Sequence, residues 1–193
     1  RESDAKARRF RANRIVQGVS IDVTSIAPLS RIPETEIESL LDRAFGADRH
    51  GRTAYRLRAG TRWMPELSFA ALDDAGRMVG LIQCWPVRLE NEPLVMVGPV
   101  AVEPDLQQKG TGRALMDAML AAADASDLPG ADALMMIGDP EYYGRFWGFS
   151  ADATAGWIID GPVERRRLLA RLRGGRTVGA HGAIRPRIEA LVG

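Results

Sequence analysis

Hydrophobic residues recur at helical spacing in several segments of the chain, and two of these segments have clear ends. In the first, acidic residues crowd the opening turn after Pro33, apolar residues follow at positions 37, 40, 41, 44 and 45, and Gly46 stands at the expected end. In the second, apolar residues at positions 115, 116, 119, 120 and 123 share one face. We therefore predict amphipathic helices at 34–45 and 114–125. Shorter helices are expected at 53–58, 139–147 and 163–172.

Other apolar runs are shorter and rich in Val, Ile and Leu, as is typical of β-strands. Two of them, 66–72 and 77–87, flank the turn sequence Asp73-Asp-Ala-Gly76 and predict an antiparallel hairpin. The run 94–102 is apolar at both odd and even positions, which favours a central strand. Gly98-Pro99 predicts a bulge or a local departure from regular pairing within this strand, because proline removes a donor from the ladder. Further strands are expected at 19–23, 131–137, 149–159 and 177–183.

The order of these elements predicts the fold class. A strand at 94–102, a helix at 114–125 and a strand at 131–137 follow one another, which indicates a crossover connection and a parallel strand pair in the sheet. Because no repeat or low-complexity block divides the chain, residues 19–193 are expected to form one α/β domain. The basic segment 1–18 is expected to be either a helix or a frayed tail.

Composition narrows the class of protein. The chain has 26 basic and 25 acidic side chains and a formal net charge of +1, which argues against nonspecific polyanion binding as its main role. Cys84 is the sole cysteine and the two histidines, His50 and His181, lie far apart, so we predict no disulfide and no metal site. Apolar runs fall far short of the ~20 residues of a membrane helix, and 1–14 lacks the apolar core of a secretory signal. We expect no membrane association and a reducing, cytoplasmic location.

The candidate chemistry is concentrated in the loop Gln107-Gln-Lys-Gly-Thr-Gly-Arg113, at the start of the second long helix. Glycines on both sides of Thr111 leave backbone N–H groups uncovered at the positive end of the helix dipole, where a phosphate can approach. Lys109 and Arg113 add positive charge. The loop lacks the Gly-Lys-Ser/Thr ending of a P-loop, and Leu115 stands where a dinucleotide fingerprint has Gly or Ala. It is therefore either an anion site of another type or a tight turn without a ligand.

This loop belongs to a longer pattern. The run Val100-Ala-Val-Glu-Pro-Asp-Leu-Gln-Gln-Lys-Gly-Thr-Gly-Arg-Ala-Leu115 resembles the acetyl-coenzyme A motif of the GNAT N-acetyltransferase superfamily. The core of that motif, Gln/Arg-x-x-Gly-x-Gly/Ala, is matched by Gln107, Gly110 and Gly112. The run Gly138-Asp-Pro-Glu-Tyr-Tyr-Gly-Arg-Phe-Trp-Gly-Phe149 resembles the second motif of the family, a tyrosine on a short helix before Gly-Phe. The two motifs occur in the family's order, with a helix and a strand between them.

The resemblance implies the GNAT fold, an α/β fold with a mixed central β-sheet in which a splayed parallel strand pair, 94–102 beside 131–137, is flanked by helices. It implies that acetyl-CoA, the acetyl donor, enters the gap between these strands. The backbone of Val100, Ala101 and Val102 would hydrogen-bond the pantetheine arm, and the glycine loop would hold the pyrophosphate. The loop residues implied in this binding are Gln107, Gln108, Lys109, Gly110, Thr111, Gly112 and Arg113.

The implied reaction is direct acetyl transfer to an amine acceptor. A base must deprotonate the amine, whose pKa is near ~10, and a backbone N–H on the strand that carries Val102 would stabilise the oxyanion. Tyr143 is expected to protonate the departing thiolate as the general acid. The family usually has three residues between this tyrosine and the Gly of Gly-Phe, and here there are four. We therefore expect a one-residue bulge near Trp147, with Tyr142 as the fallback; packing roles for both rings are the alternative.

Several assignments stay open from the sequence. The base is undetermined among the carboxylates near the strand ends, which are Glu90, Glu92, Glu103 and Asp139. The acceptor is a small-molecule or protein amine, its pocket is expected from 34–65 and the C-terminal tail, and homodimerisation is open. A catalytically degenerate, acetyl-CoA-sensing GNAT domain is a second reading. Nucleic-acid binding by the arginines of 165–176 is a third, but the interleaved leucines favour an amphipathic helix docked on the sheet.

Overall fold

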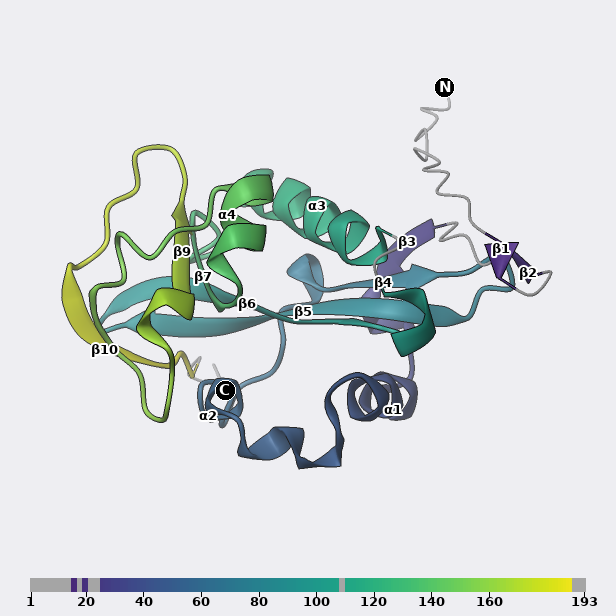
Figure 1. Cartoon of the computed structure of the whole chain (residues 1–193). Helices are drawn as coiled ribbons and strands as arrows, with labels where there is room; N and C mark the ends of the chain where they lie inside the picture. The colour runs from purple at the N-terminus through teal and green to yellow at the C-terminus, as the bar shows by residue number, and fades with distance from the viewer. Residues whose placement is uncertain (1–14, 17–18, 21–24, 108–109, 189–193) are drawn as a thin grey trace, which may run out of the picture.

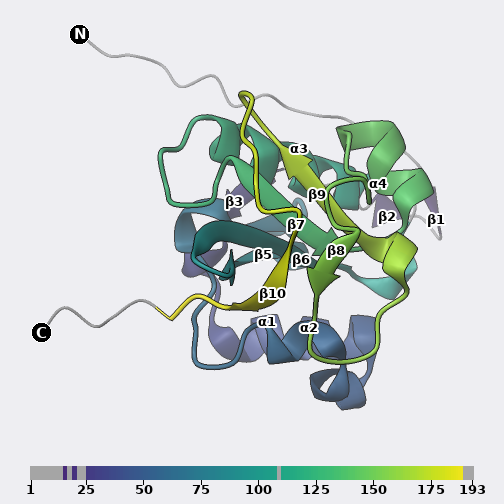
Figure 2. The ribbon, with the colours of Figure 1, turned by 90° about the vertical axis from the view of Figure 1, so that its left-hand side faces the viewer.

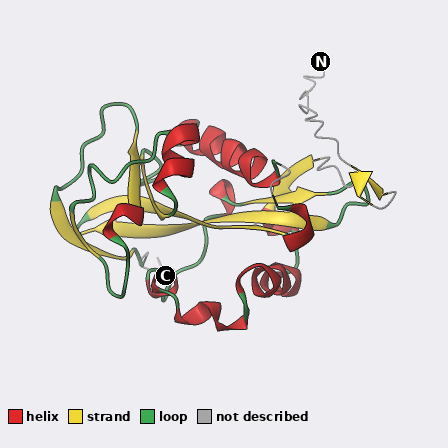
Figure 3. Ribbon diagram, viewed as in Figure 1, coloured by secondary structure: helices red, strands yellow, loops and turns green. Residues whose placement is uncertain are grey.

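The computed structural model describes residues 15–16, 19–20, 25–107 and 110–188 of the 193-residue chain (Figure 1). A central β-sheet carries helices on both faces, as Figures 1 and 3 show. Helices α1 (Glu34–Phe45) and α2 (Thr53–Arg56) cover one face, and α3 (Thr111–Asp124) and α4 (Pro140–Trp147) cover the other. This is the α/β architecture that the order of elements predicted.

The sheet is mixed and mostly antiparallel. Its strands follow the order β3–β4–β5–β6–β7–β9, and the pairing of β6 with β7 is the parallel one along this path. The bounds of these strands are β3 (Ser25–Pro28), β4 (Phe69–Leu72), β5 (Met78–Leu89), β6 (Glu92–Val102), β7 (Ala133–Ile137) and β9 (Leu168–Leu172). Strand β10 (His181–Pro186) pairs with the end of β5, and β8 (Gly156–Ile158) runs parallel to β10 at this end of the molecule (Figure 2). A separate two-stranded pair is formed by β1 (Ile15–Val16) and β2 (Val19–Ser20).

The two long helices form where the apolar spacing predicted them. Helix α1 buries Ile37, Leu40 and Leu41 against the sheet. Helix α3 buries the face that contains Leu115 and Met119 in the cluster on the opposite side of the sheet. Each fully buried side chain of this size contributes about 1.5–3 kcal/mol through the hydrophobic effect, which exceeds what helix propensity supplies.

The predicted irregularity at Gly98-Pro99 is present in β6. Ile82 of β5 pairs with Val100 and Cys84 pairs with Val97, so three steps on β6 lie opposite two steps on β5. This extra residue is a β-bulge, and it reverses which face the following side chains occupy. Four valines therefore contact the cluster under α3, two at odd positions before the bulge (95 and 97) and two at even positions after it (100 and 102).

The C-terminal third differs from the sequence prediction. The segment 163–172, expected as a helix, is a 3₁₀ turn (Arg165–Arg167) followed by strand β9, which pairs with β7 along its whole length. Leu169 packs into the core on the α3 side while Leu168 and Ala170 pack into the core on the opposite side, which is strand periodicity. The short run Leu-Leu-Ala-Arg-Leu satisfies both periods, and pairing with the free edge of β7 decides between them.

Other differences concern boundaries. The strand expected over 149–159 is reduced to β8, because the preceding residues form turns apart from a single bridge between Ser150 and Ala170. The strand expected at 66–72 begins after a 3₁₀ turn, Pro65–Leu67, and the last strand is displaced to His181–Pro186. The prediction for 1–14 and part of that for 19–23 lie outside the described residues. Within the described ranges, no helix combines the length and apolar character needed to cross a membrane.

Candidate functional site

Strands β6 and β7 separate soon after they pair. Their parallel ladder in the described chain consists of two pairs, Val95 with Leu134 and Met96 with Met135. Beyond these pairs β7 remains bonded to β9, and β6 remains bonded to β5. The edge of β6 that faces β7 therefore lacks a strand partner, within the described ranges, from Val97 onward. The splayed parallel pair implied by the sequence resemblance is confirmed.

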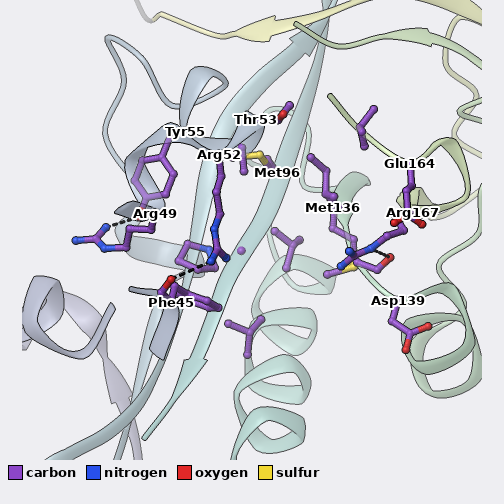
Figure 4. Close-up of a pocket in the computed structure, with 18 of the residues that line it drawn as sticks. Phe45, Arg49, Arg52, Thr53, Tyr55, Met96, Met136, Asp139, Glu164 and Arg167 are labelled. Carbon is purple, nitrogen blue, oxygen red and sulfur yellow. Dashed lines mark hydrogen bonds between the residues drawn. The ribbon is translucent and has the colours of Figure 1, made fainter. Parts of the chain in front are cut away.

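A cavity of about 1110 Å³ opens where the two strands separate. Residues 96–100 of β6 and 136–139 at the end of β7 line its centre. Side chains from 45–58 form one wall, and those from 142–143 and 162–167 form the opposite wall. Figure 4 shows Arg49, Arg52 and Tyr55 on the first wall and Asp139 and Glu164 on the second. Residues from 34–65 and from the C-terminal tail thus both border this cavity, and its use as the acceptor pocket stays a prediction.

Helix α3 begins at the glycine loop with its first N–H groups uncovered. Gly110 is the N-cap with a left-handed φ of 87°, and the first helical hydrogen bond runs from the Ala114 N–H to the Gly110 carbonyl at 3.0 Å. The N–H groups of 111–113 therefore lack intrahelical acceptors and lie at the positive end of the dipole. This is the geometry of an anion site. Gln108 and Lys109, both predicted here, lie outside the described residues.

The glycine loop lies directly on the sheet. A Cβ atom at Gly112 would be 3.8 Å from Val100 Cγ1 and 3.9 Å from Val102 Cγ2, so the predicted loop and strand residues are neighbours. Thr111 is buried, and a Cβ atom at Gly80 of β5 would lie 2.9 Å from its Cγ2 atom. The absence of a side chain at Gly80 thus permits the start of α3 to approach β5 closely.

The other predicted binding residues have different surroundings. Val100 lines the cavity, whereas Ala101 is buried on the opposite face in the cluster with α1. Val102 packs under α3, and Gln107 is exposed just before the loop. None of the described residues from 101 to 113 lines the cavity itself. The cavity and the glycine loop are therefore adjacent regions joined by the edge of β6.

Tyr143 is placed by α4 on the cavity wall. Its ring packs so closely on the backbone of Gly138 that a Cβ atom there would lie 2.7 Å from ring carbons. Burial raises the pKa of Tyr143 to about 12, and the nearby Tyr142 and Asp139 act in the same direction. A phenol with this pKa is fully protonated at neutral pH and can act as a hydrogen-bond or proton donor.

Helix α4 ends in a common glycine cap. Gly148 has a left-handed φ of 72°, its N–H donates to the carbonyls of Gly144 and Tyr143, and the N–H of Phe149 reaches the Tyr143 carbonyl at 3.4 Å. The helix is α-helical up to Trp147, so the bulge expected near Trp147 is not present in it.

Aromatic and polar contacts join α4 to α3. The indole N–H of Trp147 donates to Asp117 at 2.8 Å, and the Arg113 guanidinium lies 4.2 Å from the centre of the Phe146 ring. Tyr142, the fallback acid, is 37% exposed and packs edge-on against Tyr143 with ring centres 5.1 Å apart. The start of α3 and the tyrosines of α4 therefore keep a fixed relation to each other.

The four candidate bases have different surroundings in the structure. Glu90 and Glu92 accept backbone hydrogen bonds from the segment around β10, and Glu103 forms an ion pair with Arg43. Asp139 lines the cavity and caps α4 through the Glu141 N–H at 3.0 Å. Its interactions with the Glu141 side chain and backbone lower its pKa, so the carboxylate is ionised at neutral pH.

Sequence reasoning missed Glu164, which also lines the cavity. It was placed at the start of a helix that does not exist, so its proximity to Asp139 could not be anticipated. Arg49 and Arg58 were likewise not singled out, although both line the opposite wall and both are buried.

The arginine-rich segment does not form the helical stripe considered from the sequence. Arg165 donates to backbone carbonyls of 154, 155 and 157, and Arg166 forms an ion pair with Glu141. Arg171 and Arg173 both pair with Asp124 of α3. These guanidinium groups fasten the tail to the rest of the domain, which gives them a structural role.

Comparisons with known proteins agree with this geometry. A model of the acetyltransferase (GNAT) family matches residues 35–144, the region from α1 to Tyr143 and Gly144. The uncharacterized N-acetyltransferase YhbS of Escherichia coli K12 is 33% identical over 119 residues, which cover 61% of this chain and 68% of that relative.

Solved structures show the same likeness. The GNAT family N-acetyltransferase YhbS from Escherichia coli in complex with CoA matches with a TM-score of 0.62 and 25% identity, over 81% of this chain and 86% of that one. A GNAT family acetyltransferase from Brucella melitensis in complex with acetyl-CoA shares the fold, with a TM-score of 0.58 and 23% identity over 84% of this chain and 95% of its own.

The buried phenol of Tyr143 predicts a specific alkaline destabilisation. Its pKa rises from 10.0 to about 12 on folding, so the stability it contributes is fully present below the unfolded value and is lost as pH rises through the folded one. From about pH 9 to about pH 11, the free energy of unfolding should fall by about 1.3 kcal/mol more in the wild type than in Tyr143→Phe. Urea denaturation of both proteins measures this difference, and equal losses would contradict a buried neutral phenol.

Proposed function

The chain belongs to the acetyltransferase (GNAT) family, and from this premise we propose that it transfers the acetyl group of acetyl-CoA directly to an amine. The observation that carries the proposal is the gap between β6 and β7, which opens into the cavity beside Tyr143 and adjoins the uncovered start of α3.

The described residues fit the chemical parts of acetyl-CoA. The N–H groups of 111–113 suit a pyrophosphate, because they combine free donors with the positive end of the α3 dipole. The free edge of β6 beyond Met96 suits the amides of a pantetheine arm, which can pair with it as a strand would. Acetyl-CoA, when bound, supplies an acetyl group activated as a thioester. The residues proposed to pair with the pantetheine arm along this edge are Val100, Ala101 and Val102.

The chain's own groups would then manage protons and charge. The acceptor must attack as a neutral amine, and the carboxylates on the cavity wall, Asp139 and Glu164, are placed to receive its proton directly or through water. A carbon–nitrogen bond forms and the carbon–sulfur bond breaks. A free N–H on β6 stabilises the transient oxyanion, and Tyr143 gives its proton to the departing thiolate. Solvent then reprotonates Tyr143.

The glycine loop gives a direct test of acetyl-CoA binding. Gly112→Glu should raise the dissociation constant for acetyl-CoA by roughly 100-fold, because it sets a carboxylate beside the pyrophosphate at the start of α3. Gly112→Ala should bind within about threefold of the wild type, since a Cβ atom there meets its nearest neighbours at 3.8 Å or more. Gly112→Gln has nearly the same side-chain volume as Gly112→Glu but no charge, so comparing the two variants separates the effect of side-chain volume from that of charge. Isothermal titration with acetyl-CoA measures all four proteins, and wild-type affinity in Gly112→Glu would remove the loop from the binding site.

Tyr143 gives a test of the transfer step. Tyr143→Phe should lower kcat about 100-fold with little change in the affinity for acetyl-CoA, because only the leaving thiolate loses its proton donor. The matched control is Tyr142→Phe, which should stay within about threefold of the wild type. The assay follows free thiol released from acetyl-CoA over a panel of amine classes. Tight binding with no thiol release from any amine would instead indicate a sensing or degenerate domain.

A further inference from the structure

Arg58 is a buried cation on the cavity wall. Its side chain is 8% exposed and lines the cavity just after α2. The guanidinium carbon lies 4.3 Å from the centre of the Tyr55 ring and 5.3 Å from that of Trp85. Its Nε and Nη1 atoms are buried and have no hydrogen-bond partner in the part of the chain that the structure describes. Burial lowers the pKa of this guanidinium, as expected for a charge removed from water.

The neighbouring Arg49 shows the opposite arrangement. It is 2% exposed, forms ion pairs with Glu38 and with Asp42, the latter at 2.8 Å, and donates to the Tyr55 hydroxyl. The carboxylates on this side of the cavity are therefore already used by Arg49. Arg58 makes no ion pair with any carboxylate among the described residues.

A second buried donor lies beside Arg58. The indole N–H of Trp85 is also buried without a hydrogen-bond partner in the described chain. Buried polar groups in native proteins are nearly always paired, and an unpaired charge is far more costly than an unpaired neutral donor. Of these two residues, Arg58 lines the cavity, so its unpaired nitrogens are the ones that a ligand in the cavity can reach.

The charges of the cavity are distributed between its two walls. Arg58 and Arg52 lie on the wall built by 45–58, and Arg52 bonds a backbone carbonyl rather than a carboxylate. Asp139 and Glu164 lie on the opposite wall (Figure 4), where Tyr143 also opens to the cavity. The walls are joined where Thr53 Oγ1 donates to the Pro162 carbonyl at 2.6 Å. Arg167 also lies on this second wall and donates to the Gly138 carbonyl at 3.4 Å, so the two carboxylates there face one cation. The second wall is therefore the more acidic and attracts an amine, and the wall with Arg52 and Arg58 attracts an anion.

We propose that the acetyl acceptor is an amine that also carries a carboxylate, and that Arg58 binds this carboxylate. The inference rests on the proposed acetyl transfer and specifies its substrate class. The amine lies toward Asp139, Glu164 and Tyr143, where the thioester is proposed to lie, and the carboxylate crosses the cavity to the unpaired nitrogens of Arg58. Neutral amines of the same length fill the same space but leave the buried cation without an acceptor.

The test uses paired acceptors that differ in one group. A series of ω-amino carboxylates of increasing chain length is compared with the corresponding ω-amino carboxamides, with acetyl-CoA as donor and thiol release as the readout. At the best chain length, the wild type should prefer the carboxylate by about 10- to 100-fold in kcat/KM, the range expected for a hydrogen bond to a charged group. The chain length of the optimum reports the span from the reacting amine to Arg58.

Two variants assign this preference to Arg58. Arg58→Met keeps an unbranched apolar stem but removes the guanidinium and its charge, and the carboxylate preference should fall close to one. Arg56→Met is the matched control, since Arg56 lies on α2, is half exposed, pairs with Asp160 at 3.2 Å and does not line the cavity. This variant should retain the preference of the wild type.

Thermal denaturation separates the proposal from a structural role for Arg58. Because the ligand-free cation contacts the Tyr55 and Trp85 rings but no carboxylate, Arg58→Met should have a melting temperature close to that of the wild type. A large fall would mean that the chain itself neutralises Arg58, which overturns the proposal. Equal rates for carboxylates and carboxamides would overturn the substrate class but leave acetyl transfer intact. Thiol release with neither series, although acetyl-CoA binds, would overturn the transfer activity and this inference with it.

Discussion

Two residue pairs hold β6 against β7, and the separation of these strands beyond the pairs determines where a ligand can enter the domain. A sheet that stayed paired would satisfy its backbone groups internally and would leave no opening between 96–100 and 136–139. The bulge at Gly98-Pro99 also helps to place the start of α3 beside this opening. By reversing the direction of the following side chains, it keeps Val100 and Val102 under α3, so the start of that helix lies beside the free edge.

The remaining structure fixes what surrounds the gap. Close packing of Thr111 against Gly80 positions the start of α3 on the sheet, and the Trp147–Asp117 hydrogen bond holds α4 beside it. Strand β9 covers the outer edge of β7 and brings the 162–167 segment to the cavity. The site is thus assembled from segments that lie on both faces of the sheet, with the strand separation as their common centre.

Much of this arrangement could be predicted from the sequence, because its signals are local. Helical spacing located α1 and α3, the Gly-Pro pair located the bulge, and the two motifs located the glycine loop and Tyr143. The prediction failed where one short pattern satisfies two periods. Residues 168–172 form a strand only because the edge of β7 is free, and a helix there placed Glu164 wrongly. The lack of a carboxylate partner at Arg58 could not be predicted either, since it depends on the ion pairs that Arg49 forms with the nearby carboxylates.

We propose that the free edge of β6 and the start of α3 form one continuous binding surface for acetyl-CoA. Amide hydrogen exchange of the intact chain, measured with and without saturating acetyl-CoA, tests it most directly. We expect slower exchange in both 97–102 and 110–113 when acetyl-CoA is bound, with little change in α1 or β10. Unchanged exchange in these two segments at saturation, or protection confined to another part of the sheet, would contradict the claim.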